Sequence, residues 1–420
     1  MATKLNTNLY SPALFDIQQD IIGSLPLDLI KNWLQTEQNQ EAADKLLEPY
    51  KVKGYSVSSD SAGLSKLSKT KTLLEVLAII NQPKEIVYTV GKHIGGQGIG
   101  IWAADNTQMF YPSEVKAETL VSALLTVQQE ISKTCQIKIG LGAHYGEFYL
   151  INGGLYGASA DAIEEIAEND TEGGEVLITE SIYNLLPPDH TFKIVKKGEE
   201  TDEIVGRSYT VLEGPVLANA PVLDKYYPMP YSEDFYADLI TFENDLSNTE
   251  LGKTLESKYL KNKAVVLLER ENQEIEEHKL SMFANMSFSA LVKDIGLQTL
   301  TKHTGDEIKV IGNLGIYVFD TPTMAVSFSR AVQKELAQRD VLTRIGIDMG
   351  SVFIFDLPLG GKDIAGMPVN LASKMAQDKG RFGYIYLNGH LKQAVDVQSM
   401  TEISYTVSGV EMTIYEDFND

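Results

Sequence analysis

The sequence predicts an α+β fold made of two related domains, and two observations lead to this prediction. Strand-like and helix-like segments mix without strict alternation along the chain, which is typical of the α+β class. One pattern also occurs twice, in residues 141–186 and 345–396. Asp161-Ala-Ile-Glu-Glu165 returns as Asn370-Leu-Ala-Ser-Lys374, and Gly174-Glu-Val-Leu-Ile178 returns as Gly383-Tyr-Ile-Tyr-Leu387, each 209 residues later (370 − 161 and 383 − 174). A repeat this long indicates a tandem pair of domains.

Composition narrows the class of protein. The 420 residues include 36 basic and 58 acidic side chains, a net charge of −22, which disfavours binding to nucleic acid or to anionic membranes. No segment approaches the roughly 20 apolar residues of a membrane span, and the single Cys135 cannot form an internal disulfide. The beginning of the chain shows no cleavable export signal. We therefore expect a folded cytoplasmic protein that neither inserts into a membrane nor binds nucleic acid.

The N-terminal extension, residues 1–49, is predicted to be helical. Ser11-Pro12 supplies a cap and a first turn, apolar residues then recur at helical spacing, and a second helix is expected at about 29–33. We expect these helices to pack on the first domain. The alternative is a helix that binds a partner or a second copy of the chain.

The first domain is assigned to residues 50–213. Its sequence predicts a strand at 55–58, a helix from about 70 to 80, a glycine-rich hairpin at about 91–101 and a helix from about 112 to 132, followed by the first copy of the repeated block.

Residues 214–262 form a linker whose composition differs from that of its neighbours. Four prolines are interleaved with five aromatic residues and many acids, and this much aromatic area favours a linker packed against the domains. The second domain, 263–420, begins with a strand at 264–268 and a helix that runs to about 303.

The ordered motifs of each copy resemble the catalytic domain of class III adenylate and guanylate cyclases. In the second copy these are Gly305-Asp-Glu-Ile-Lys309-Val-Ile-Gly312-Asn313, the repeated blocks and Val407-Ser-Gly-Val-Glu411; in the first, Asp60-Ser-Ala-Gly-Leu-Ser65 and the stretch from Gly157 to Leu186. The resemblance covers about four fifths of the chain. It implies a ferredoxin-like βαββαβ core in each domain and an intramolecular head-to-tail pair of domains with composite sites. In such sites two aspartates of one domain hold two Mg²⁺ ions, while the other domain supplies a base-reading lysine and aspartate, a ribose-orienting asparagine and a phosphate-binding arginine.

The metal face of the first domain is incomplete in this alignment. Asp60 falls on the first metal-binding aspartate, but the second falls on Gly96 or, in another alignment of the hairpin, on Lys92. Neither residue is a carboxylate, so Asp60 is the lone metal candidate.

The opposing face, from the second domain, is better preserved. Lys309 and Asp363 fall on the base-reading pair, Asn370 on the asparagine and Lys374 on the arginine position. We expect these four residues to bind a nucleotide, ATP or GTP, with Mg²⁺ or Mn²⁺ required only if the nucleotide binds. Asn370 and Lys374 would act in catalysis only if the protein is active.

The reciprocal site is poorer. Its metal positions fall near Glu269 or Arg270 and on Asn313. The first domain offers Gly154, Asp161 and Glu165 where aspartate, asparagine and arginine are wanted, and two carboxylates one helical turn apart repel a polyphosphate. We expect no catalysis there.

Three functional hypotheses follow. The first is a catalytically degenerate tandem cyclase-like protein that acts as a regulator or scaffold in intracellular signalling, binds an unidentified protein partner and senses a purine nucleotide. The second is a weak nucleotidyl cyclase that uses the same site. The third is a structural interaction module without a nucleotide.

Overall fold

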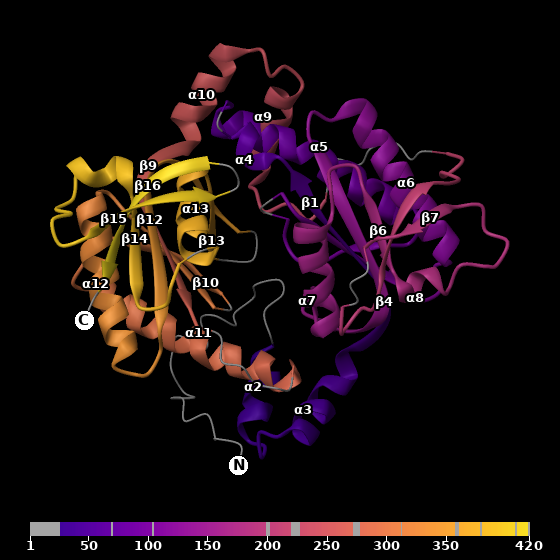
Figure 1. The fold of residues 1–420 in the computed structure, drawn as a ribbon, viewed down its shortest axis with the longest axis horizontal. Helices are drawn as coiled ribbons and strands as arrows, with labels where there is room; N and C mark the ends of the chain where they lie inside the picture. The colour runs from indigo at the N-terminus through magenta and orange to yellow at the C-terminus, as the bar shows by residue number, and fades with distance from the viewer. Residues whose placement is uncertain are drawn as a thin grey trace. The chain divides into compact units, whose positions relative to one another are not determined.

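The computed structural model describes residues 26–418 except 69, 103–104, 199–201, 220–226, 272–277, 312, 358–360, 379 and 408–409. The chain divides into two compact units, which are described separately. The first unit contains residues 47–252. The second contains residues 253–420 together with the N-terminal helices α2 (Leu27–Leu34) and α3 (Gln40–Leu47). Figure 1 traces the chain through both units.

The first unit is a mixed sheet with helices. Its strands are β1 (Lys51–Ala62), β2 (Gln97–Gly98), β3 (Thr107–Pro112), β4 (Lys138–Ile151), β5 (Gly154–Tyr156), β6 (Val176–Thr179), β7 (Lys193–Lys196) and β8 (Ser208–Glu213). Its helices are α4 (Leu64–Leu67), α5 (Leu73–His93), α6 (Ala117–Thr134), α7 (Ala158–Glu165), α8 (Glu180–Tyr183) and α9 (Glu233–Glu243); the short turns η1 (Glu48–Tyr50) and η2 (Ile166–Asp170) complete it, and α10 (Thr249–Tyr259) leads into the second unit.

The second unit repeats this order. Its strands are β9 (Leu260–Arg270), β10 (Asp306–Ile311), β11 (Leu314–Phe319), β12 (Thr343–Asp356), β13 (Lys362–Ala365), β14 (Tyr384–Asn388), β15 (Thr401–Val407) and β16 (Val410–Phe418). Its helices are α11 (His278–Leu300), α12 (Pro322–Ala337) and α13 (Met367–Ser373), with the turns η3 (Lys374–Asp378) and η4 (Gly389–Gln393).

The two sheets have the same topology. The strand order is β2-β3-β1-β4-β6-β8-β7 in the first and β10-β11-β9-β12-β14-β16-β15 in the second, and β5 and β13 pair with β4 and β12. Strands β1 to β4 with α5 and α6 form a βαββαβ core in the order expected for a ferredoxin-like fold. The predicted α+β class and the predicted tandem repeat are both confirmed.

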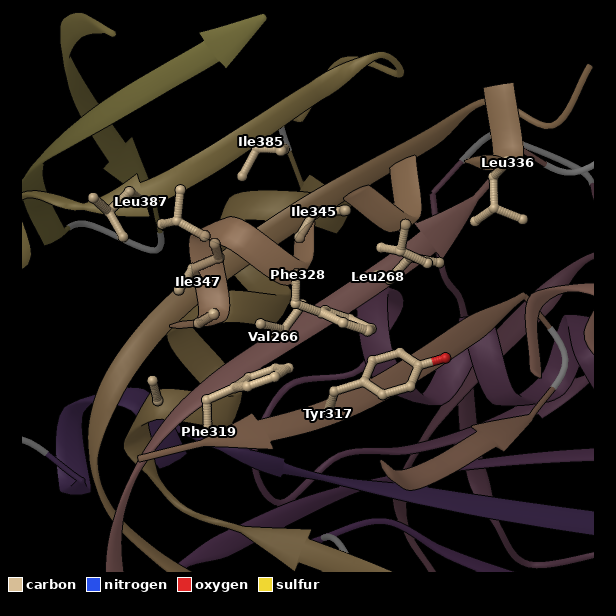
Figure 2. Packing of buried hydrophobic residues seen from close by; sticks show 14 of the residues in the cluster. Val266, Leu268, Tyr317, Phe319, Phe328, Leu336, Ile345, Ile347, Ile385 and Leu387 are labelled. Carbon is tan, nitrogen blue, oxygen red and sulfur yellow. The ribbon is translucent and has the colours of Figure 1, made fainter. Parts of the chain in front are cut away.

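The core explains why these segments form strands. Along β9, Val266 and Leu268 contact the cluster that includes Phe328 of α12, whereas Val265 and Leu267 contact the cluster that includes Ala372 of α13. Successive strand residues point to opposite faces, so both faces of the sheet are buried and the middle of the strand, residues 264–268, is apolar. Figure 2 shows the α12 side, where Tyr317 and Phe319 of β11 surround the Phe328 ring.

Several local predictions need correction. The helix expected to end at about Ile80 is α5, which begins at a Thr72–Glu75 capping box and continues through Pro83 to His93. The expected hairpin at 91–101 is therefore wrong, because its first residues are helical. Buried side chains that follow Ile80 in α5 pack against α9, and this contact maintains the helix beyond the proline.

The outer segments also differ from expectation. Residues 26–46 group with the second unit rather than packing on the first, while the helix expected to begin at Ser11-Pro12 lies outside the described residues. The described part of the linker is packed, as predicted: Tyr227, Tyr231 and Phe235 are all buried. Among the described residues no helix is long and apolar enough to cross a membrane.

Candidate functional site

Asp60 lies near the end of β1, beside a second carboxylate that the sequence analysis missed. In the β1–β3 ladder Ser59 pairs with Thr107, so the residues that precede Thr107 lie opposite Asp60 and Ser61. Asp105 is one of them. Burial, followed by the negative charges of Asp105 and Glu168, raises the pKa of Asp60 to about 7. Burial likewise raises the pKa of Asp105.

Gly96 and Lys92 are not at this position. Lys92 lies in the last turn of α5, and Gly96 lies between that helix and β2, where an added Cβ would be 2.4 Å from the Tyr111 ring. The first unit has a longer connection between β2 and β3 than the second unit has between β10 and β11, and this moves the residues opposite Asp60 away from Gly96 and Lys92.

The Asp60–Asp105 pair has the chemistry of a divalent-cation site. Two partly or largely buried carboxylates repel each other, and a cation with oxygen ligands would relieve that repulsion. The positive charge of Lys84 offsets some of it at Asp105. Within the described ranges no group of three or more His, Cys, Asp or Glu side chains is arranged to hold a metal, so remaining ligands would have to come from elsewhere, such as phosphate oxygens or water.

In the second unit, the structure brings Lys309 and Asp363 together. Lys309 of β10 is bonded through Nζ to Asp363 Oδ1 of β13 at 2.6 Å. The same carboxylate oxygen accepts a hydrogen bond from the Ile364 backbone N–H at 2.8 Å, and the Asp363 residue is buried. A cationic donor and an anionic acceptor are thus fixed side by side. This combination can match the donor and acceptor edge of a purine base.

Asn370 and Lys374 lie one turn apart at α13 and its continuation η3. Val369, Ala372 and Ala376 bury the opposite side of this helix against the sheet, in the cluster that also contains Ile364, next to Asp363. Asn370 is exposed and Lys374 is partly exposed. Gly366 precedes the first turn of this helix with φ 149°, and a Cβ added there would be 2.8 Å from the Ser351 carbonyl oxygen, so only glycine fits.

The metal position of the second unit is filled by an ionic cluster. Leu314 pairs with Glu269, and the Arg270 N–H donates to the Asn313 carbonyl. Glu269 pairs with Arg344, the residue before Ile345, and Asp60 pairs with Gly140, the residue before the equivalent Leu141, so Glu269 is the counterpart of Asp60. Glu269 accepts from Arg344 Nε at 2.5 Å and from Asn313 Nδ2 at 3.0 Å. Its carboxylate is fully used within the protein, and the adjacent buried Arg270 would repel a cation. A divalent cation at this face would have to displace Arg344 from Glu269 and approach the Arg270 guanidinium.

We predict that Arg344→Leu lowers stability without changing nucleotide affinity. The change leaves a nearly buried Glu269 carboxylate without its cation, which should cost about 2 kcal/mol of unfolding free energy. Urea unfolding and nucleotide titration of the same sample check both parts. Loss of nucleotide affinity in a folded variant would show that this face takes part in binding.

The first unit offers an acidic surface where the second has Asn370 and Lys374. Asp161 and Glu165 occupy α7, and Glu168 follows in η2; all three are exposed. The described residues of this helical stretch include no lysine or arginine between 158 and 170. An anionic phosphate would meet repulsion here, as the sequence predicted.

Comparisons with known proteins give the fold. No protein-family model and no curated protein matches the chain. A solved class III adenylyl cyclase-like ATP-binding protein from Pseudomonas aeruginosa is 10% identical and covers 92% of each chain with a TM-score of 0.50. The adenylyl cyclase CyaB from P. aeruginosa is 16% identical and covers 39% of this chain and 95% of its own, with a TM-score of 0.35. The guanylyl cyclase Cya2, also 16% identical, covers 37% of this chain and 91% of its own, with a TM-score of 0.31. With its two sheets of identical topology and its full-length likeness, the chain has the fold of a tandem pair of class III nucleotidyl cyclase-like domains.

Proposed function

We propose that this protein binds a purine nucleoside triphosphate through Lys309, Asp363, Asn370 and Lys374, and a divalent cation through Asp60 and Asp105. The observation that carries the proposal is the 2.6 Å pair of Lys309 with the buried Asp363. Lys309 pairs across the strands with Ile316, which belongs to the cluster that packs on α13. A lysine–carboxylate pair that only stabilised the fold could be replaced by apolar residues at little cost. In our proposal the pair recognises the base of a nucleotide that Asn370 and Lys374 also contact.

The charge of each of the four side chains determines its proposed role in nucleotide binding. The Lys309 ammonium donates to a ring acceptor of the base, and the Asp363 carboxylate accepts from an amino or imino group. Lys374 supplies a positive charge for phosphate, and the Asn370 amide can orient the ribose. The full-length structural relative is described as an ATP-binding protein, which makes ATP the first ligand to test. GTP is tested beside it because a Lys–Asp pair has partners on either purine.

The role of this binding, in our proposal, is regulatory. Lys374 retains the charge of the family's arginine but cannot form a bidentate contact with a phosphate, and loss of such an arginine costs about 10³–10⁵ in rate in comparable phosphate-transfer sites. A nucleotide held without efficient turnover is suited to sensing, with the bound form presented to a protein partner.

A second candidate function is weak nucleotidyl cyclase activity. The neighbouring Asp60 and Asp105 favour it, because the sequence alone suggested one carboxylate and the register places two at this end of the strands. Bound divalent cations would supply activation of the ribose hydroxyl and charge neutralisation at the α-phosphate. The chain's own residues would hold the cations, orient the ribose through Asn370 and balance phosphate charge through Lys374.

Calorimetric titration separates these functions. ATP and GTP are titrated with Mg²⁺, with Mn²⁺ and with neither, and cyclic nucleotide is measured by mass spectrometry after long incubation. Saturable binding without product supports the regulatory role. Product that disappears in both Asp60→Asn and Asp105→Asn establishes the cyclase, and no binding of either nucleotide rejects the proposal in favour of an interaction module. The predicted pairing of the two domains remains a prediction; it gains support if Asp60→Asn weakens nucleotide binding.

A further inference from the structure

A buried strap from the linker packs on α5 and on Trp102 in the first unit. The strap is defined here as Tyr227–Glu243; it contains α9, which packs on α5. Tyr227, Tyr236 and Phe242 are each at most 5% exposed. A flexible spacer does not bury this much aromatic surface, so the strap is a packed part of the first unit.

The strap is tied to α5 by a buried polar network. Tyr227 Oη donates to Asn81 Oδ1 at 2.6 Å, and Asn81 Nδ2 donates to Glu85 Oε1 at 3.0 Å and to Glu243 Oε2 at 2.7 Å. Tyr236 Oη donates to the same Glu85 oxygen at 3.1 Å. The Asn81 side chain is thus hydrogen-bonded to both ends of the strap: its oxygen accepts from Tyr227, and its nitrogen donates to Glu243. Such a network fixes one arrangement, because any shift leaves buried polar groups unpaired.

The strap also holds Trp102, which precedes Asp105 by three residues. The Trp102 indole stacks on the Tyr227 ring with centroids 5.7 Å apart and an angle of 17°, and the Trp102 backbone N–H donates to the Pro228 carbonyl at 2.9 Å. Pro228 also approaches Gly98 so closely that an added Cβ would be 2.4 Å from its Cγ. Trp102 is therefore held by the side chain of Tyr227 and the backbone of Pro228, and Asp105 follows three residues later.

Lys84 joins the strap to the carboxylate. This fully buried lysine of α5 donates to the Trp102 carbonyl at 2.9 Å, and its Nζ lies 5.7 Å from the centroid of the Tyr227 ring. The charge of Asp105 acts on the same ammonium group. One side chain therefore contacts Trp102, faces the strap and interacts electrostatically with Asp105.

We propose that Tyr227 is a positioning residue for Asp105: by stacking on Trp102, three residues earlier in the chain, it holds Asp105 beside Asp60, so that strap order and cation binding are coupled. This inference rests on the proposed cation site. The coupling acts in both directions: displacement of the strap weakens cation binding, and a bound cation stabilises the strap.

The test measures Mn²⁺ affinity by electron paramagnetic resonance of the free ion, using the full chain. Tyr227→Leu is expected to weaken binding about tenfold, because it removes both the stack and the hydroxyl while leaving every charge near Asp105 in place. Tyr227→Phe retains the ring and should stay within about twofold of the parent. Tyr231→Leu is the matched control: Tyr231 is an equally buried strap residue that packs edge-on against Phe235, and its loss should leave Mn²⁺ affinity unchanged.

Tryptophan fluorescence gives a second readout that a purely structural role would not move. Trp33 and Trp102 are the only tryptophans, so Trp33→Phe leaves Trp102 as the sole reporter. After this background is shown to bind Mn²⁺ normally, Mg²⁺ should shift the Trp102 emission, and Asp105→Asn should abolish the shift. An unchanged Mn²⁺ affinity in Tyr227→Leu, or an equal loss in Tyr231→Leu, overturns the positioning role. Mn²⁺ binding that is absent in the parent, or that persists in Asp60→Asn and Asp105→Asn, instead refutes the proposed cation site.

Discussion

Replacing Asp60 by asparagine should make the protein more stable at pH 8 and at the same time remove most of its Mn²⁺ affinity. The pKa of Asp60 in the folded state is raised to about 7 from a usual value of 3.8. The folded state therefore holds this proton more tightly than the unfolded state, and stability falls as the pH rises from about 4 through 7. Above pH 7 the ionised carboxylate carries the full penalty. Asparagine has no charge to bury, so it avoids this penalty.

The expected gain is about 2 kcal/mol at pH 8, roughly half of what the full pKa shift represents, because Asp60 is partly exposed. The unfolding midpoint should rise by roughly 4–8 °C at pH 8 and change little at pH 4. Mn²⁺ affinity should fall at least about tenfold, since the amide replaces one of two anionic ligands. Thermal scans at both pH values, with and without Mn²⁺, measure all of these effects.

Asp348→Asn is the matched control. Asp348 of β12 is 2% exposed, and burial raises its pKa to about 7 as well, but it lies in the second unit and has no place in the proposed cation site. Its replacement should also stabilise the protein at pH 8 and leave Mn²⁺ binding unchanged. If Asp60→Asn stabilised the fold and still bound Mn²⁺ like the parent, Asp60 would be a buried acid without a ligand role.

The fold could be predicted from the sequence because the repeat requires two domains of the same topology. Two copies of one pattern must form two copies of one topology, and the alternation of residues such as Val265 and Val266 between the two faces of β9 identifies a doubly covered strand. Helix ends were less accessible. A proline such as Pro83 usually ends a helix. Here the packing of α5 on α9 of the linker stabilises the helix by more than the loss of one backbone hydrogen bond destabilises it.

Only part of the candidate site could be predicted from the sequence. Lys309 and Asp363 are far apart in the sequence and were placed together through the family resemblance, and the structure pairs them directly. The sequence did not point to Asp105, because the second metal position was matched to the glycine-rich stretch that contains Lys92 and Gly96. A usable signal was present in the apolar run Met109-Phe-Tyr111, which marks a strand; counting back from it would have placed Asp105 opposite the end of β1. The strap could not be foreseen, since its contacts join residues about 150 positions apart.

Lys309→Met should reduce nucleotide affinity by about 10- to 100-fold. A hydrogen bond from a charged donor contributes about 1.5–3 kcal/mol, and methionine retains the apolar stem while removing the ammonium group. Asp363 would keep its hydrogen bond from the Ile364 N–H, so the base would meet an acceptor without its neighbouring donor. Calorimetry with ATP and GTP measures the change, and the nucleotide with the larger loss is the one whose acceptor Lys309 contacts.

Lys263→Met separates recognition from stability. Lys263 forms an equally short ion pair, 2.6 Å to Asp320 Oδ1, in the same unit, and it is assigned no part in the proposed site. Both variants lose one lysine charge and one ion pair, so nonspecific attraction of a polyphosphate falls equally in each. A tenfold gap in affinity between them at matched unfolding midpoints assigns the Lys309–Asp363 pair to ligand recognition. Equal affinities would mean that the pair only braces β10 against β13, and the nucleotide site would then have to be sought elsewhere.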